Sequence, residues 1–433
     1  MLCVFITLTS PSQYLLLRAT VTWLLLVRSF RELVPTFSIL TQDLISLSLL
    51  TLRIWITVLI INVQFSSTLK GYLRKVWILL LIRLSLVFFC SDILLLYFFF
   101  EISLIPIFIV VIGWGYQPER LAAGIFLFFY TLFASIPLLL FIFKVSTDSG
   151  SHYSLLSGVG PLEVKGLLFF IGVIAFMVKF PVFGLHMWLP KAHVEAPVSG
   201  SMVLAGVLLK LGGYGLLRIE KYFSSSIRFL FLRSFILIGG GLLRVFCLGA
   251  SDLKILIAYS SVVHMALIVI GFKWFRSLGI SGGIIIILAH GICSSGLFAM
   301  ANRFYERSHS RSFNLNKGLL ARAPFIVGMA FFLIRANFGG PFTLNLLGEI
   351  LLILSLGQIN QGLLVSILLL SFFSAAYRLI LFRRVIQGRM SSSREGSHEY
   401  SSRELRFCLA HCWPLFTLCL RPRFNYNKKF IYF

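Results

Sequence analysis

The chain has 433 residues, of which 58% are hydrophobic and only 12% are charged. Soluble domains have roughly 45–50% apolar and roughly 25% charged residues, so a water-soluble globule is excluded. The 39 lysines and arginines exceed the 15 acidic residues by 24. Because many of these basic residues fall in short connections between apolar runs, we interpret them as loops that orient a membrane protein and contact lipid, not as a nucleic-acid surface.

Apolar runs follow one another along almost the whole chain. Lipid forces backbone groups to pair within a segment, so each run predicts a helix. The runs lie at 14–27, 44–63, 76–90, 92–113, 120–144, 164–188, 194–218, 228–249, 253–272, 279–301, 319–337, 343–358, 361–384 and 404–420. Since a crossing needs roughly 20 apolar residues, we expect an all-α polytopic membrane protein of about 13–14 transmembrane helices.

Helix breakers interrupt two of the expected spans. FMVKFPVFGLHMWLPK contains Pro181, and RANFGGPFTLNLLGE contains Pro341. Proline removes a backbone donor and clashes with the preceding turn, so we expect helix breaks at Pro181 and Pro341. Broken helices in both halves of a membrane chain are typical of transporters with an ion site near the middle of the bilayer. The polar stretch 388–405 is predicted to be a linker before the last helix.

Six titratable residues lie deep in different apolar runs. They are Glu101, Lys179, Lys210, His264, His290 and Glu349. A charge in lipid is unfavourable by a few kcal/mol unless it is paired, hydrated or neutralised. A dehydrated lysine can release its proton and an imidazole can relay one, so this set predicts a path for protons. Structural ion pairs, snorkelling lysines and histidines that only join helices are the alternatives.

Hydroxyl groups accompany both histidines. Ser260 and Ser261 lie four and three residues before His264, and Ser294 lies four residues after His290. Residues three and four apart share a helical face. We therefore expect two polar stripes on consecutive helices, where hydroxyls hold bridging water.

Neither a metal site nor a cofactor site is predicted on this chain. The seven cysteines form no CxxC pair, and the local cluster of Cys408, His411 and Cys412 lacks a fourth ligand. We interpret it as small apolar side chains on a late helix. No phosphate-binding loop or dinucleotide fingerprint stands between a strand and a helix, so redox or nucleotide chemistry on this chain is not expected.

At these residues the chain resembles the antiporter-like membrane subunits of mitochondrial NADH:ubiquinone oxidoreductase, respiratory complex I. The likeness rests on FFFEISLIPIFIVVIGWGYQPERLAAG, FMVKFPVFGLHMWLPKAHVEAPVSGSMVLAGVLLKLGGYGLLRI, SDLKILIAYSSVVHMALIVIG, LAHGICSSGLFAMANRFYERSHSR and LNLLGE. It spans roughly residues 41 to 405. The resemblance implies two inverted five-helix repeats, each with a broken helix. It divides the chain into N-terminal membrane helices (1–75), a first repeat (76–218), a second repeat (219–387) and a linker with a C-terminal helix (388–433).

The resemblance also implies a function, a location and partners. The chain would translocate protons in the mitochondrial inner membrane, among other membrane-arm subunits and lipid. The complex would use NADH, FMN, iron–sulfur clusters and ubiquinone, but none of them would be bound by this chain. Glu101 and Lys179 would form the regulatory ion pair, Lys210 would be the central lysine, His264 and His290 the relay, and Glu349 the terminal acid. Movement of Lys179 relative to Glu101 would change the proton affinity of Lys210.

Two other functions remain open from the sequence. The first is a subunit of the related multi-subunit cation/proton antiporters, which share the lysine and glutamate core. The mitochondrial-type sequences GYQPERLAAG and HVEAPVSGSMVLAGVLLKLGGYG favour the respiratory complex over such an antiporter. The second is a scaffold whose ion pairs are purely structural.

Five arginines lie within or beside apolar runs, where a guanidinium is hard to accommodate. They are Arg53, Arg83, Arg244, Arg335 and Arg378. We hypothesise that some are serines in the protein, decoded here through the wrong genetic code. The low methionine count of 8 fits a parallel misreading of methionine as isoleucine. If so, the net charge is inflated, but the six titratable positions stand.

Overall fold

The computed structural model describes residues 44–64, 70–90, 92–149, 166–219, 228–272, 277–313, 315–318, 324–358, 361–386 and 402–420. Regular structure in these ranges is helical. The helices are α3 (Leu44–Gln64), α4 (Lys70–Phe89), α5 (Ile93–Ile102), α6 (Leu104–Trp114), α7 (Arg120–Ser149), α8 (Gly166–Lys179), α9 (Trp188–Glu195), α10 (Val198–Val203), the π-helix η2 (Leu204–Leu208), α11 (Leu209–Ile219), α12 (Arg228–Gly249), α13 (Leu253–Phe272), α14 (Ser277–Ser308), α16 (Pro324–Asn337), α17 (Leu344–Gly357), α18 (Gln361–Ile386) and α19 (Ser402–Leu420). The expected run at 14–27 lies outside the described residues.

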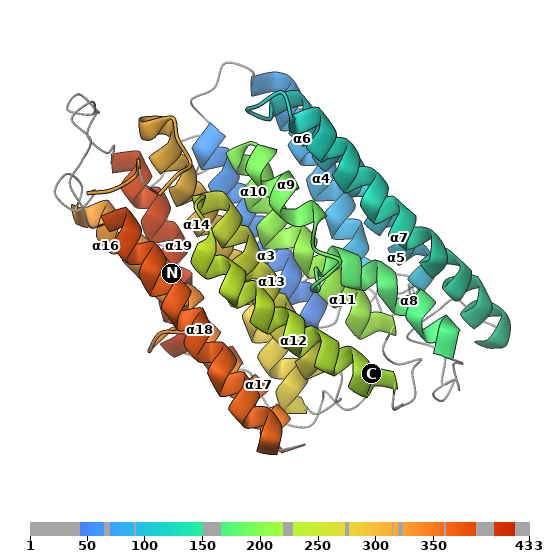
Figure 1. Ribbon diagram of the computed structural model, residues 1–433. Helices are drawn as coiled ribbons and strands as arrows, with labels where there is room; N and C mark the ends of the chain where they lie inside the picture. Colours follow the sequence, from blue (N-terminus) through green and yellow to red (C-terminus); the bar gives the residue numbers. More distant parts are fainter. Residues whose placement is uncertain are drawn as a thin grey trace.

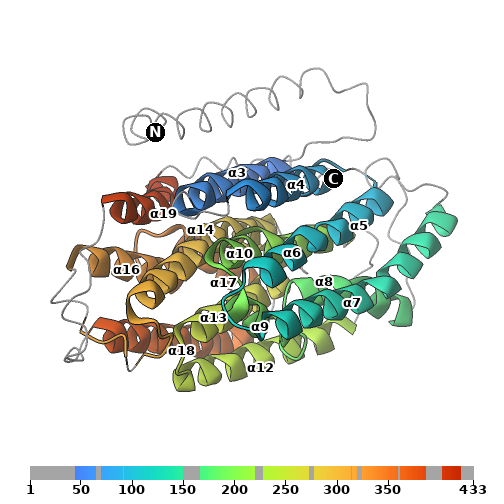
Figure 2. The ribbon, with the colours of Figure 1, turned by 90° about the horizontal axis from the view of Figure 1, so that it is seen from above.

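The helices lie side by side as one elongated bundle (Figure 1). Seen from above, α14 and α10 run between α3 on one side and α12 and α18 on the other (Figure 2). In the most apolar stretch of α14, 94% of the residues are buried, against 33% in α7. Helix α14 is therefore the central helix of the bundle, whereas α7 exposes apolar side chains at the surface of the bundle.

Five helical stretches among the described residues combine enough length and apolarity to cross a membrane. They are Ile93–Trp114, Arg120–Asp148, Val198–Ile219, Leu253–Phe272 and Ser277–Ser308. Shorter apolar helices lie at Ile45–Ile60, Leu168–Lys179, Ser234–Gly249, Pro324–Asn337 and Leu344–Gly357. The described helices follow the predicted runs closely, whereas the total of 13–14 crossings stays a prediction.

Both expected helix breaks are present. Helix α8 ends at Lys179, just before Pro181, and α9 begins at Trp188. Helix α16 ends at Asn337, and α17 begins at Leu344 after a turn that contains Gly339 at φ +69°. Glycine adopts such a positive φ without the steric cost that a side chain would bring.

Two further irregularities were not predicted. The expected helix at 92–113 is divided at Ser103, three residues before Pro106. The expected helix at 194–218 contains the π-helical turn Leu204–Leu208 directly before Lys210. π-Helical turns are rare and occur frequently at functional sites.

Candidate functional site

Glu101 and Lys179 form a buried ion pair. Lys179 Nζ lies 2.8 Å from Glu101 Oε1, and the two side chains are 5% and 17% exposed. The ammonium also lies 3.1 Å from the centroid of the Phe100 ring and 3.4 Å from the Phe100 carbonyl oxygen. The carboxylate and the aromatic face together compensate the charge of Lys179, as a cation removed from water requires.

Lys179 is the last residue of α8. Backbone carbonyls at a helix C-terminus lack partners within the helix and can accept hydrogen bonds from side chains. The indole of Trp188, the first residue of α9, donates to the Val178 carbonyl at 2.9 Å. Helix α11 packs directly against this break, because a Cβ on Gly212 would lie 2.7 Å from the Phe180 backbone nitrogen. The helix that carries Lys210 therefore contacts the break that positions Lys179.

Lys210 has a different environment, which contains neutral acceptors. Its Nζ donates to the Ala205 carbonyl at 2.7 Å, within the π-helical turn, and lies 3.0 Å from His290 Nδ1. The side chain is fully buried. A π-helical turn displaces its carbonyls from the α-helical pattern, so Ala205 can accept from Lys210 on the same helix.

Two glycines bring Lys210 and His290 together. A Cβ on Gly291 would lie 3.1 Å from the Gly206 carbonyl oxygen and 2.8 Å from Leu52 Cδ2. Small residues let membrane helices approach closely. This contact between η2 and α14 holds His290, the neighbour of Gly291, beside the Lys210 ammonium.

The line continues from His290 to Glu349. The rings of His290 and His264 have centroids 5.0 Å apart, and His264 Nδ1 lies 3.6 Å from Glu349 Oε1. Both histidines are buried, and the Glu349 side chain is 14% exposed. Four of the six predicted residues thus form one row across α11, α14, α13 and α17.

The second helix break positions the end of this row. Where α16 ends, the Asn345 amide donates to the Ala336 carbonyl at 2.7 Å. His264 Nε2 lies 3.0 Å from the Asn337 carbonyl oxygen. A Cβ on Gly339 would lie 2.7 Å from Glu349 Oε2. Only a residue without a side chain lets the Glu349 carboxylate lie against the turn.

The expected hydroxyl stripes are buried, but they bond mainly to their own helices. Ser260 and Ser261 donate to Ile257 and Ala258 carbonyls at 2.7 and 2.6 Å, and Ser294 donates to the His290 carbonyl at 2.6 Å. Across helices, Ser260 accepts from the Asn337 amide at 3.4 Å. Their predicted role in holding water stays a prediction.

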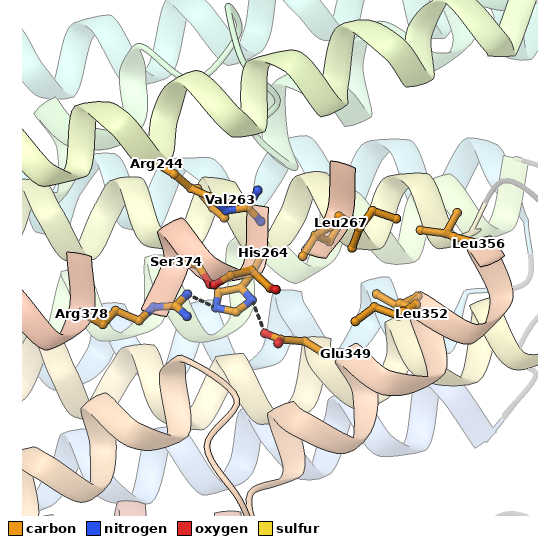
Figure 3. A pocket seen from close by; sticks show the side chains of 12 residues that line it. Arg244, Val263, His264, Leu267, Glu349, Leu352, Leu356, Ser374 and Arg378 are labelled. Carbon is orange, nitrogen blue, oxygen red and sulfur yellow. Dashed lines mark hydrogen bonds and ion pairs between the residues drawn. The ribbon is translucent and has the colours of Figure 1, made fainter. Parts of the chain in front are cut away.

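Arginine side chains crowd the pocket beside Glu349. Figure 3 shows the His264 imidazole between the Arg378 guanidinium and the Glu349 carboxylate. Arg378 Nη2 lies 2.7 Å from His264 Nε2, the same nitrogen that faces the Asn337 carbonyl. That nitrogen cannot accept from the guanidinium and donate to the carbonyl at once.

Arg378 and Arg244 are 1% and 2% exposed, and Nε and Nη1 of each lack a hydrogen-bond partner among the described residues. Such orphaned buried donors are unfavourable. Arg335, which the sequence singled out, instead donates to the Pro341 carbonyl at 2.9 Å on the exposed side of the break. The expectation that Arg335 is hard to accommodate stays a prediction, whereas the orphaned buried donors described here belong to Arg244 and Arg378.

Several buried polar residues were missed by sequence reasoning. Lys254, His193 and Glu195 are 2%, 0% and 4% exposed, although they stand at the ends of apolar runs. Residues at the ends of apolar runs are expected to contact water. These three are buried because other segments of the fold pack over them. The dense sequence KAHVE, with three titratable residues in five, was the available signal.

Within the described ranges, no group of three or more His, Cys, Asp and Glu side chains is placed to hold a metal ion. In the CLAHC segment, the His411 imidazole contacts the Phe407 carbonyl at 3.1 Å, and Cys408 Sγ contacts Met300 sulfur at 3.2 Å. These contacts fit the interpretation of this segment as a packed helical face.

Comparison with known proteins gives consistent matches. A family profile described as "NADH:quinone oxidoreductase/Mrp antiporter, TM" matches residues 90–374. The NADH-ubiquinone oxidoreductase chain 4 of Aedes aegypti is 46% identical over 331 residues, covering 76% of this chain and 74% of the relative. The protein of the same name from Rhipicephalus sanguineus is 37% identical over 435 residues, covering 98% and 97%.

Solved structures share the fold. A chain of respiratory complex I from Thermus thermophilus with bound NADH superposes with a TM-score of 0.78 at 26% identity, covering 91% of this chain and 84% of that one. A chain of the Mrp complex from Dietzia superposes with a TM-score of 0.77 at 17% identity, covering 88% and 81%. At 17% identity the second likeness concerns the fold alone.

Proposed function

Since the chain belongs to the NADH-ubiquinone oxidoreductase chain 4 family, we propose that it moves protons along the row Lys210, His290, His264 and Glu349. The chain is a multi-pass, proton-translocating subunit of complex I in the mitochondrial inner membrane. The resemblance seen in the sequence, with the function and location that it implies, is thereby confirmed. The roles of individual residues are our proposal.

One observation carries this proposal. Lys210 Nζ, the two imidazoles and the Glu349 carboxylate are successive neighbours in one row. The steps are 3.0 Å from Lys210 to His290, 5.0 Å between ring centroids, and 3.6 Å from His264 to Glu349. The Lys210 ammonium gives its proton to His290, the imidazoles pass it on, and the Glu349 carboxylate receives it. Imidazole suits this relay because it binds and releases protons near neutral pH.

The Glu101–Lys179 pair acts as the electrostatic control of this row. While the pair is closed, the carboxylate 2.8 Å away compensates the charge of Lys179. When the pair opens, that charge is uncompensated beside α11 and changes the electrostatic potential at Lys210. Interactions between charges are strong in a buried environment, so a small movement of Lys179 has a large effect.

We also infer that the chain is built from two inverted five-helix repeats, 76–218 and 219–387. Each unit contains a helix that is interrupted by a non-helical segment of several residues, α8–α9 in the first and α16–α17 in the second. A functional residue accompanies each break, Lys179 in the first and Glu349 in the second. Broken helices at corresponding places are the expected sign of such repeats.

Redox chemistry is assigned to other subunits of the complex. NADH, FMN, iron–sulfur clusters and ubiquinone have no binding residues predicted on this chain, and its partners are the other membrane-arm subunits and lipid. The alternative of a cation/proton antiporter subunit draws on the shared fold at 17% identity and on a family profile whose description names both kinds of protein. The relatives at 46% and 37% identity favour the respiratory complex.

The test is proton transport by reconstituted complex I that carries Lys210→Ala. The substitution removes the central proton donor, so pumping is expected to fall by about tenfold or more. The amount of assembled complex is measured in parallel, and Lys144→Ala, at an exposed surface pair with Asp148, is the matched control. Undiminished pumping by assembled Lys210→Ala complex would favour the purely structural scaffold.

A further inference from the structure

Helix α3 packs against the place where Lys210 meets its two partners. It lies on one side of α10 and α14 (Figure 2), and it contacts α4 and α19 as well. The proposed repeats begin at residue 76, so α3 belongs to neither of them. None of the residues in the proposed row comes from this helix. Two of its apolar side chains nevertheless lie against the backbone segments that hold Lys210.

The first of these contacts joins Ile56 to the π-helical turn. A Cβ on Gly206, in the middle of that turn, would overlap the Cδ1 atom of Ile56. Ile56 is 0% exposed. The residue before Gly206 is Ala205, whose carbonyl accepts a hydrogen bond from Lys210 Nζ at 2.7 Å. Ile56 therefore covers the turn that supplies the first partner of Lys210.

The second contact joins Leu52 to α14. A Cβ on Gly291 would lie 2.8 Å from Leu52 Cδ2, and Leu52 is itself buried. The residue before Gly291 is His290, whose Nδ1 lies 3.0 Å from Lys210 Nζ. Both partners of Lys210 thus stand next to a glycine that an α3 side chain covers.

One face of α3 makes both contacts. Leu52 and Ile56 are four residues apart, so their side chains lie one above the other on the same side of the helix. The two glycines also meet each other, because a Cβ on Gly206 would lie 3.4 Å from the Gly291 carbonyl oxygen. Helix α3 therefore packs into the line along which η2 and α14 touch.

The π-helical turn depends on its surroundings for support. Such turns are rare, so the packing around this one has to favour it over a regular α-helix. All residues of the turn Leu204–Leu208 are buried. Closely packed interiors have few voids and transmit small displacements. A shift of Ile56 or Leu52 consequently moves the Ala205 carbonyl or the His290 imidazole relative to the Lys210 ammonium.

We propose that Leu52 and Ile56, which we call the α3 clamp, are positioning residues for Lys210. The clamp holds η2 against α14. Through this contact it keeps the Ala205 carbonyl and the His290 imidazole within hydrogen-bonding distance of the Lys210 ammonium. Neither clamp residue touches the proton that is transferred. This inference rests on the proposed function of Lys210.

The first test removes part of the clamp. Ile56→Ala takes away the atoms that cover Gly206. Ile60→Ala makes the same truncation one turn further along α3, at a residue that is 2% exposed. Pumping is measured in reconstituted complex I and normalised to the amount of assembled complex. We expect Ile56→Ala to slow pumping by up to about tenfold, because a misplacement of 1 Å costs about a hundredfold. Ile60→Ala should pump at the wild-type rate.

The second test moves a methyl group from one side of the contact to the other. Gly206→Ala places a methyl group where Ile56 Cδ1 lies, and Ile56→Val removes that atom. In the double variant the nearest remaining atoms lie 3.4 and 3.5 Å from the new Cβ, which is ordinary van der Waals contact. We expect Gly206→Ala to pump slowly and the double variant to recover most of the wild-type rate, because residues in contact are coupled. Combining Gly206→Ala with Ile60→Val should bring no recovery.

Two controls separate positioning from general stability. Alanine is a better helix former than glycine, so slow pumping in Gly206→Ala does not come from a lost helix propensity. Gly328→Ala, where a Cβ meets nothing within 4 Å, controls for the glycine substitution itself. The amount of assembled complex is followed separately by native electrophoresis, so a variant that only folds less well keeps its pumping rate per complex.

The outcomes separate this inference from the proposed function. Equal pumping by assembled Ile56→Ala and Ile60→Ala complexes, together with loss in Lys210→Ala, would overturn the α3 clamp and leave the role of Lys210 intact. Recovery of Gly206→Ala by Ile60→Val as well as by Ile56→Val would show a general loosening of the bundle, and it would likewise overturn the clamp. Wild-type pumping in Lys210→Ala would overturn the proposed function itself.

Discussion

Lys179 and Lys210 are both buried lysines, but their partners differ in kind. Lys179 contacts a carboxylate at 2.8 Å and an aromatic face. Lys210 contacts a backbone carbonyl at 2.7 Å and an imidazole at 3.0 Å, both neutral acceptors. An ion pair retains the proton of the lysine, whereas neutral partners let it leave. We therefore propose that Lys179 controls the electrostatic potential along the row and that Lys210 exchanges its proton.

Arginine at each lysine position should give the largest contrast between the two. Lys179→Arg keeps a cation beside Glu101, so we expect it to retain most of the pumping rate. Lys210→Arg keeps the charge but removes the exchangeable proton, so pumping should fall by about tenfold or more. Proton uptake by reconstituted complex, normalised to assembly, measures both. Equal losses in the two variants would remove the distinction between the lysines.

Removing the partner of Lys179 should destabilise the protein as well as uncouple it. Glu101→Gln leaves a buried cation without its carboxylate, which costs about 3–5 kcal/mol. We expect less assembled complex, measured by native electrophoresis. The double substitution Glu101→Gln with Lys179→Met should restore assembly without restoring normal coupling. If Glu101→Gln assembles normally, the pair contributes little to stability and the contrast with Lys210 weakens.

A smaller effect should follow from widening the contact that holds Lys210 beside His290. The methyl group of Gly291→Ala would lie 3.1 Å from the Gly206 carbonyl oxygen, so α14 must shift by a few tenths of an ångström. We expect pumping to fall by about tenfold or less, because a 1 Å misplacement costs about a hundredfold. Gly328→Ala, where a Cβ meets nothing within 4 Å, should pump normally. Matching losses in both variants would point to helix flexibility and not to spacing.

The last prediction concerns residue identity and requires no substitution. We expect peptide mass spectrometry of the purified protein to find serine at positions 378 and 244. A hydroxyl at 378 could face His264 without opposing the Asn337 carbonyl, whereas the two guanidiniums leave donors unpaired. Serine at these positions would also leave Lys210 and Lys179 as the principal cations near the row. Arginine masses at 378 and 244 would refute the misreading hypothesis there.

Much of the fold follows from the sequence, because lipid permits few alternatives to apolar helices. The runs at 253–272 and 228–249 are reproduced to the residue by α13 and α12. Pro181 predicted the break after Lys179 because its effect on the backbone is local. The placement of six titratable residues on separate helices was also readable from the chain alone.

Other parts of the site depend on packing between distant segments. The π-helical turn before Lys210 contains no proline that would indicate an irregular helix, so the local sequence does not predict it. The approach of Gly206 to Gly291 becomes visible only when η2 and α14 are placed together. Lys254 stands at the start of a helix, where the sequence suggests exposure, and it is buried because the end of α9 covers it.

We propose that the row from Lys210 to Glu349 carries the pumped proton. The most direct measurement is the number of protons pumped per electron pair by reconstituted complex I with Glu349→Gln, beside the control Asp148→Asn at an exposed pair. We expect fewer protons per electron pair, or arrested turnover, in assembled Glu349→Gln complex and a normal ratio in the control. A normal ratio at normal turnover in Glu349→Gln would contradict it.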